Sequence, residues 1–110
     1  MARKKNWTLL VLERARELVR KGWTKGVNAR DSRGGRVNVE SAGAVSFCAY
    51  GAVERAEFEL DVPHYARSEA WRLFKKAIPP NRGSGVTFND ASPNRRGVLL
   101  VFNKAIKRVT

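Results

Sequence analysis

Apolar residues recur with the period of a helix near the start of the chain. The apolar side that this period predicts consists of Val11, Leu12, Ala15, Leu18 and Val19. Asn6 or Thr8 can accept hydrogen bonds from the first backbone amides and so cap the start of this helix. Gly22 stands where a left-handed residue ends many helices, which would place Trp23 to pack back onto Leu18. The pattern predicts a first helix that begins near Trp7 and ends at Gly22.

The helical period is lost over residues 24–40. Val27 and Ala29 alternate with polar residues before residues 31–36, and Val37 and Val39 alternate with polar residues after them. Alternation on both sides of a glycine-containing turn is typical of a β-hairpin. The tip of this hairpin would display three arginines close together, namely Arg30, Arg33 and Arg36.

A second helix is predicted from just after Ser41 to about Leu60. Its inner side would consist of Val45, Cys48, Ala49, Ala52, Val53 and Ala56. Glycine inside a helix is less favourable than alanine by about 1 kcal/mol, so Gly51 indicates that another backbone passes close by. Asp61 and Pro63 then mark a break, with Asp61 as a possible cap and Pro63 in the first turn of a third helix that continues to residues 79–80.

The C-terminal part is expected to hold a loop, a short extended piece and a last helix. Residues 79–85 are rich in proline and glycine, and residues 86–88 are interpreted as extended. Ser92 and Pro93 predict a helix start, as cap and first residue, and the buried stripe would be Val98, Val101, Phe102, Ala105 and Val109. The predicted fold class is mainly α (α+β), with about four helices and one small hairpin in a single compact domain.

The length of 110 residues suits one domain, which we expect at residues 7–110 after a basic N-terminal arm at residues 1–6. No apolar run is long enough to span a membrane, and Arg3, Lys4 and Lys5 lead into an amphipathic segment and not into an apolar signal sequence. One cysteine and one histidine exclude an internal disulfide and a zinc finger. We therefore expect a cytoplasmic protein with no metal and no cofactor.

Charge is the strongest compositional signal. Lysine and arginine total 22 against 10 acidic residues, a net charge of +12 that is distributed over the domain. A compact domain repels itself at this charge, which favours an anionic partner, either nucleic acid (DNA or RNA) or an acidic protein surface. The basic residues expected to contact phosphates, most of them with few acids nearby, are Arg33, Arg36, Arg72, Lys75, Lys76, Arg95, Arg96, Lys104, Lys107 and Arg108.

Candidates for catalysis and metal binding are few. Cys48, His64 and an acid, Asp31 or Asp90, could in principle form a nucleophilic set. However, Cys48 is predicted in the middle of a helix, away from a helix N-terminus that would lower its pKa, and free cysteines are usually buried. The acidic group at residues 54–61 lacks histidine and the spacing of a calcium loop, so we interpret it as a solvated face that pairs with neighbouring arginines.

Three ordered motifs resemble those of a known family. They are Gly-Trp-Thr-Lys-Gly at residues 22–26 with Ala-Arg-Asp at residues 29–31, then Ser-Phe-Cys-Ala-Tyr-Gly-Ala at residues 46–52, then Phe-Asn-Asp at residues 88–90. In this order they are similar to a family of small uncharacterised domains from bacteria and bacteriophages. The resemblance covers roughly residues 9–108, with Phe88 where tryptophan is usual. The resemblance implies a bacterial or bacteriophage context, but it implies no activity, because none is assigned to the family.

The matched residues allow two interpretations. In the first, which we favour, they are scaffold: Trp23 fixes the first helix, Cys48 and Gly51 form a close contact, Asp31 closes a turn and Asp90 binds backbone amides. In the second, Asp31, Cys48, Asn89 and Asp90 converge on a small pocket of an enzyme or ligand-binding module. The function hypothesis is a non-enzymatic, phage- or mobile-element-type accessory protein that binds nucleic acid. The alternatives are a module or inhibitor that docks on an acidic surface of a host protein complex, and a small enzyme that uses Cys48.

Overall fold

The structure is a computed structural model that describes residues 6–110, so residues 1–5 of the expected basic arm lie outside the described part of the chain. The predicted class, mainly α, is confirmed, with five helices and a two-stranded antiparallel sheet in the described residues. The elements are α1 (Trp7–Lys21), β1 (Ala29–Arg30), β2 (Ser46–Phe47), α2 (Ala49–Leu60), α3 (His64–Ala77), α4 (Val86–Ala91) and α5 (Arg95–Lys107). Among residues 6–110, no helix combines the length and the apolar character needed to cross a membrane.

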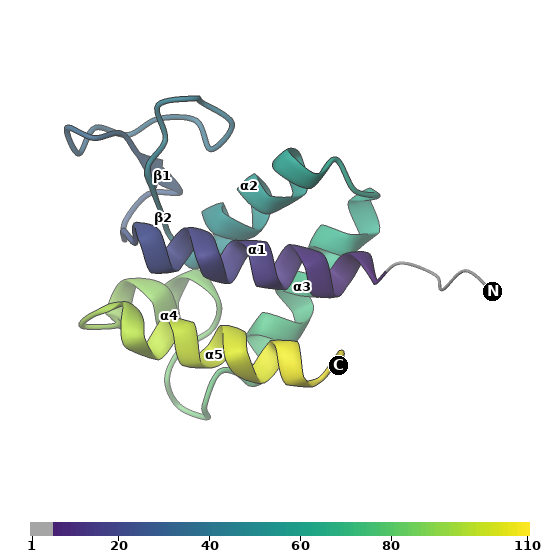
Figure 1. Ribbon diagram of the computed structural model, residues 1–110. Helices are drawn as coiled ribbons and strands as arrows, with labels where there is room; N and C mark the ends of the chain where they lie inside the picture. The colour runs from purple at the N-terminus through teal and green to yellow at the C-terminus, as the bar shows by residue number, and fades with distance from the viewer. Residues whose placement is uncertain (1–5) are drawn as a thin grey trace.

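Helix α1 is the central element of the fold. It packs against α2 on one side and α5 on the other, with α3 behind it (Figure 1). Its buried side contains the five apolar residues that the sequence predicted. The side chain of Asn6 caps the helix by accepting a hydrogen bond from the Leu9 amide at 3.0 Å. The core around α1 is mainly aliphatic but includes aromatic side chains, and the ring centroids of Phe74 and Phe102 lie 4.7 Å apart.

The glycine after α1 has a different role from the one that the sequence suggested. Gly22 has φ −163°, which is extended backbone, so the predicted left-handed ending is wrong. A Cβ atom at this position would lie 2.2 Å from the carbonyl oxygen of Val45. The neighbouring residue Trp23 forms a parallel bridge with Phe47. Glycine is therefore required here because another backbone passes against it, which a single helix pattern cannot reveal.

Helix α2 begins eight residues after Ser41, later than predicted. Residues 41–47 form a turn and β2, and Val45, expected on an inner helix face, is 49% exposed. Cys48 is the N-cap residue of α2, so its predicted position in the middle of a helix is wrong. The close backbone contact at Gly51 is confirmed, because a Cβ atom there would lie 2.0 Å from the carbonyl oxygen of Asn28.

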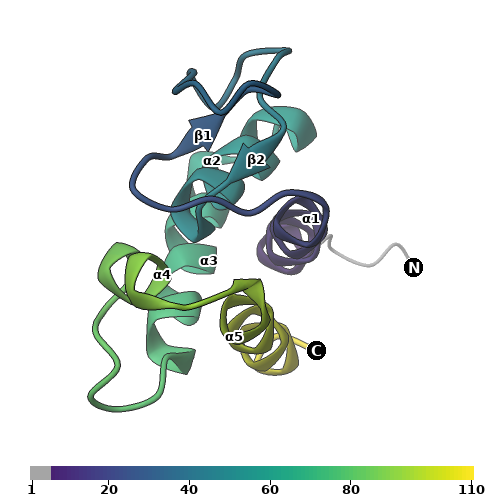
Figure 2. The same cartoon turned by 90° about the vertical axis from the view of Figure 1, so that its left-hand side faces the viewer.

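The predicted hairpin is correct in its turn but not in its sheet partner. The carboxylate of Asp31 accepts hydrogen bonds from the amides of Arg33 and Gly35, which closes the turn, and Arg30 and Arg36 form a single bridge. However, β1 pairs in the sheet with β2, which lies sixteen or more residues along the chain (Figure 2). The alternating pattern at 37–39 predicted a strand, but residues 36 and 37 only touch β1, through the Arg30–Arg36 bridge and a hydrogen bond from the Val37 amide to the Ala29 carbonyl oxygen at 3.1 Å. The strand partner of β1 is β2, which pairs along its other edge.

The two ends of α4 also differ from the prediction. Residues 86–88, predicted as extended, form the first turn of α4. Ser92 ends this helix, because its amide and its hydroxyl both donate to the carbonyl oxygen of Phe88. The cap of α5 is Asn94, whose side chain accepts from the Arg96 amide. Asp61 likewise ends α2 in a left-handed conformation and does not cap α3.

Replacing Gly51 by alanine tests the close contact between α2 and residue 28. We expect Gly51→Ala to lower the free energy of unfolding by about 1–3 kcal/mol or more, because the new methyl group overlaps the Asn28 carbonyl. Urea denaturation measures this change. The control is Gly43→Ala, where the nearest atom would be 3.6 Å away, with an expected change within about 0.5 kcal/mol. Equal effects of the two substitutions would contradict the packing described.

Candidate functional site

The side chain of Asn89 lies fully buried at the junction of three segments. Its carbonyl oxygen accepts hydrogen bonds from Trp23 Nε1 at 2.8 Å and from the amide of Ala49 at 2.9 Å. Its amide nitrogen donates to the carbonyl oxygen of Thr24 and to Asp90 Oδ1. All four hydrogen-bonding positions of the carboxamide are used. This residue therefore joins the segment after α1, the start of α2 and α4.

Asp90 extends this network to the backbone. Its Oδ1 atom accepts from the amide of Gly26 at 3.0 Å. Lys25 donates to the carbonyl oxygen of Ser92 at 2.7 Å, so the segment after α1 is also bonded to the end of α4. Asp31 lies outside the network and is engaged in its own turn. Of the four residues proposed for a pocket, Asn89 and Asp90 are therefore joined in a structural network in which the Asn89 carboxamide is fully paired.

Cys48 is held as a helix cap. Its Sγ atom accepts from the Gly51 amide at 3.3 Å and lies 3.7 Å from Asn28 Oδ1. Burial raises the pKa of the thiol above its ordinary value, although the hydrogen bonds from the backbone amides of Gly51 and Tyr50 act in the opposite direction. A helix N-terminus would lower this pKa, but desolvation outweighs that effect here. At neutral pH the group is therefore mostly a thiol.

His64 does not approach Cys48 in a catalytic arrangement. Its ring hydrogen-bonds to Glu57 at 3.1 Å and to Arg67 at 3.0 Å, at the start of α3. Arg67 also forms ion pairs with Glu54 and Glu57, and Glu59 pairs with Arg14 and Arg55. The acidic group at residues 54–61 thus pairs with neighbouring arginines, as the sequence predicted. No cluster of three or more potential metal ligands occurs among residues 6–110.

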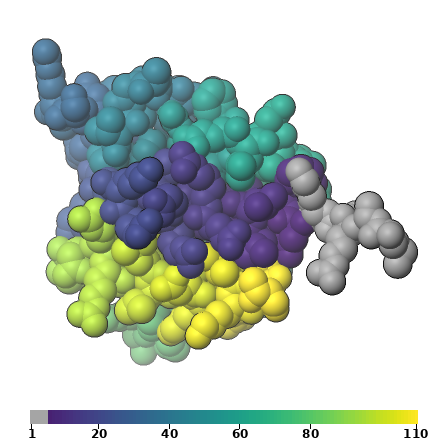
Figure 3. All heavy atoms as spheres, viewed as in Figure 1, coloured from purple at the N-terminus to yellow at the C-terminus, as the bar shows by residue number. Residues whose placement is uncertain are grey.

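The structure divides the ten predicted phosphate-contacting residues among three places. Arg33 and Arg36 are exposed at the turn before β2. The blue segment that contains this turn lies at the top of Figure 3, on the other side of α1 from the yellow end of the chain. Arg72, Lys75 and Lys76 are exposed on α3, but Arg72 forms an ion pair with Glu69, which also interacts with Lys76. The largest group is on α5 or next to its end and comprises Arg95, Arg96, Lys104, Lys107 and Arg108. The single arginine-rich tip proposed for the hairpin is incomplete, because Arg30 folds back onto Thr24, Lys25 and Gly34.

Four of the five basic residues at α5 are unpaired within the described part of the chain. Arg95 donates to the carbonyl oxygen of Arg20 at 2.7 Å and so helps to satisfy the end of α1. The other four have no side-chain hydrogen bond or ion pair with any residue in the described part of the chain, and all are exposed. We call these four the α5 basic face: Arg96, Lys104, Lys107 and Arg108.

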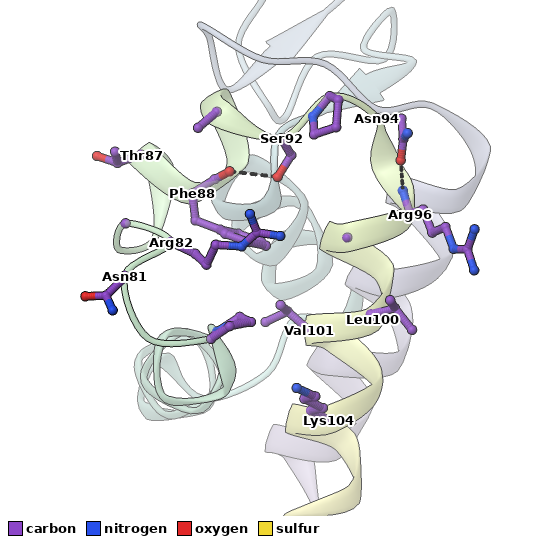
Figure 4. Close-up of a pocket in the computed structure, with 15 residues that line it drawn as sticks. Asn81, Arg82, Thr87, Phe88, Ser92, Asn94, Arg96, Leu100, Val101 and Lys104 are labelled. Carbon is purple, nitrogen blue, oxygen red and sulfur yellow. Dashed lines mark hydrogen bonds between the residues drawn. The ribbon is translucent and has the colours of Figure 1, made fainter.

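A groove of about 590 Å³ lies beside this face, between residues 79–83, α4 and α5. Figure 4 shows Phe88 and Val101 at its floor and Leu100 along its α5 edge. Arg82 extends from the opposite edge toward α5, and Lys104 lies farther along the helix. No acidic residue lines the groove. The floor is thus apolar and the rim is cationic.

Sequence reasoning missed this groove and the part that Arg82 plays in it. Residues 79–85 were correctly expected as a loop, but nothing in the local pattern placed that loop against α5. The only local signal was the position of Arg82 between Pro79-Pro80 and the glycines at 83 and 85, and this pattern does not by itself predict a binding site.

Comparison with known proteins gives a family and no activity. The model of the family described as "Family of unknown function (DUF6197)" matches residues 8–108. No curated protein and no solved structure matches the chain. The match agrees with the resemblance that the ordered motifs suggested, as far as a domain of unknown function over nearly the whole chain.

Replacing Asn89 by alanine should destabilise the fold strongly. The change leaves the Trp23 indole and the Ala49 amide without their acceptor, and each unpaired buried donor is unfavourable by about 1–3 kcal/mol. We therefore expect a loss of about 2–5 kcal/mol in the free energy of unfolding, measured by urea denaturation. Asn103→Ala, at an exposed position that accepts from Arg16, is the control and should change stability by less than about 1 kcal/mol. A similar small effect at Asn89 would show that the network is dispensable.

The thiol of Cys48 should react slowly in the native protein. Because burial raises its pKa and covers the sulfur, we expect a thiol-specific chromogenic disulfide to label Cys48 at neutral pH far more slowly in the native state than in concentrated guanidinium. The time course of absorbance measures both rates on the same sample. Native labelling as fast as that of the denatured chain would contradict the cap geometry and restore Cys48 as a candidate nucleophile.

Proposed function

The chain belongs to the DUF6197 family of unknown function, and we propose that it is a non-enzymatic accessory protein that binds nucleic acid through contacts between basic side chains and phosphates. The observation that carries this proposal is the α5 basic face. Its four cations have no acidic partner among residues 6–110, whereas Arg14, Arg20, Arg55, Arg67 and Arg72 each pair with a glutamate.

Helical geometry places these cations together. Residues three or four apart lie on the same side of a helix, so Arg96, Leu100 and Lys104 form a line that Lys107 and Arg108 continue. α5 buries its opposite side against α1 and α3, which keeps this line outward. Cations at regular spacing along a helix can contact successive phosphates. When they bind, counterions condensed on the nucleic acid are released.

The end of α3 can extend the contact surface. α3 packs against α5, and Lys75 and Lys76 are exposed in its last turn, just before the loop that carries Arg82. These residues would add phosphate contacts beyond the α5 basic face. Phosphate contacts supply affinity without reading a base sequence, so we propose binding that is largely independent of sequence.

The same surface could instead dock on an acidic protein, such as a component of a host complex. The exposed Leu100 within the basic face is the observation that keeps this alternative, because exposed apolar residues among charges are typical of protein interfaces. An enzyme that uses Cys48 is the weaker alternative, since the thiol is buried and hydrogen-bonded as a cap. We propose a cytoplasmic setting, and the motif resemblance is the support for a phage or mobile-element context.

Removing two cations from the α5 basic face should weaken nucleic-acid binding and reduce its salt dependence. For Lys104→Gln/Lys107→Gln, we expect the slope of log affinity against log salt to fall by about 1.8 on duplex DNA, since each phosphate contact contributes about 0.9. Fluorescence anisotropy with labelled oligonucleotides between ~50 and ~200 mM salt measures this slope.

The control removes the same number of charges elsewhere. Arg33→Gln/Arg36→Gln changes two unpaired cations on the far side of α1 and should leave the slope within error. If both double variants lower the slope equally, binding follows net charge and the α5 basic face is not a defined site. If the wild type binds no oligonucleotide at ~50 mM salt, the nucleic-acid proposal is wrong and nuclease-resistant pull-downs should look for a protein partner.

A further inference from the structure

We propose that the groove between residues 79–83, α4 and α5 holds unpaired bases, so that the preferred ligand is single-stranded nucleic acid. This inference rests on the proposed function and adds the class of ligand. Three features of the groove support it: its apolar floor, the cations on its rim and the anchoring on α3 of the loop that carries Arg82.

The floor of the groove offers apolar contact to a flat ligand. Leu100 is 53% exposed at its edge, and Pro79, Ala91 and Pro93 add apolar surface around a floor in which Phe88 and Val101 are largely buried. A volume of about 590 Å³ lies within the range of small-molecule sites, roughly 300–1,000 Å³. Phosphates alone gain nothing from such a surface. A base that leaves water to lie on it does gain, through burial of its faces.

The rim of the groove is cationic on both sides. Arg82 reaches in from the loop and Lys104 lies on the α5 side, whereas the guanidinium of Arg96, also on α5, points away from the loop (Figure 4). No acidic residue of the described part of the chain lines the groove. A strand that follows the groove can therefore place its phosphates near the rim and its bases toward the floor. The planar guanidinium of Arg82 can also stack on a base.

The loop that presents Arg82 is held in place by packing against α3. Gly85 lies so close to Trp71 that a Cβ atom would be 2.8 Å from the indole ring. Trp71 in turn stacks on the buried Phe74 with 5.1 Å between ring centroids. Asn81 and Gly83 have φ of 66° and 86°, which turn the chain on either side of Arg82. The end of this loop is therefore anchored on the core three residues from Arg82.

Two other ligands fit the groove less well. Duplex DNA keeps its bases paired and stacked inside, so it can use the rim but cannot reach the floor. An acidic, leucine-rich peptide could use both. The cations continue beyond the groove along α5 to Lys107 and Arg108. This extended row favours a nucleic acid, which carries one phosphate charge per nucleotide, over a short acidic peptide.

The test compares single strands with duplexes for a variant at the edge of the groove. We expect the wild type to bind a mixed-sequence single strand of about 12 nucleotides more tightly than the corresponding duplex. Leu100→Gln, which keeps the helix and all charges, should weaken the single strand about fivefold and leave the duplex unchanged. Leu100→Trp should tighten the single strand, because an aromatic ring stacks better on a base. Anisotropy measures all the affinities, and circular dichroism checks that each variant is folded.

The control substitution is Val45→Thr, which changes an equally exposed apolar residue outside the groove and should affect neither ligand. If Leu100→Gln leaves the single strand unchanged, or weakens both ligands equally, the groove inference is overturned while nucleic-acid binding stands. If the wild type binds neither ligand, the proposed function itself fails. Displacement of the single strand by a glutamate- and leucine-containing peptide of equal charge, at equal concentration, would overturn the inference in favour of a protein partner.

Discussion

The buried carboxamide of Asn89 is the interaction on which the arrangement of the non-helical segments depends. A buried polar group is strongly unfavourable unless its hydrogen bonds are made, and here four partners from three segments must meet at one side chain. This requirement fixes the segment after α1 against the start of α2 and against α4. Because α4 leads into α5 through three residues, the network also sets where the α5 basic face begins.

The distribution of acids determines which cations are available to a partner. Glu54, Glu57 and Glu59 lie on α2 and pair with arginines of α1, α2 and α3. Burial by itself raises the pKa of Glu59, but hydrogen bonds from Arg14 and Arg55 outweigh it and hold that pKa below its ordinary value. The acidic charges of α2 are thus neutralised by arginines of the same chain. The net positive charge is left to other surfaces, and α5, which follows the last acidic residue of the chain, carries the largest share.

The errors in reading the sequence share a physical origin. Gly22 and Gly51 are both places where a second backbone lies within contact distance. The pattern identified the contact at Gly51, but at Gly22 it predicted a left-handed helix ending where the backbone is extended. Ser92 has the residue type of a helix start, yet its hydroxyl bonds backward to Phe88, so the preceding helix ends there and Asn94 caps the next. The residue type determines which hydrogen bonds a side chain can make, and the surrounding backbone determines which of these bonds forms.

The sequence by itself determined the helical class, the buried stripe of α1 and most of that of α5, the neutralised acidic segment and the basic charge, because these depend on the spacing and kind of nearby residues. Only the tertiary structure decided that Cys48 is a buried cap, that Asn89 joins three segments and that Arg82 faces α5 across an apolar groove. Each of these depends on residues from distant parts of the chain that are brought together by packing around α1. Local pattern carries no information about such distances, so the candidate site became visible only in three dimensions.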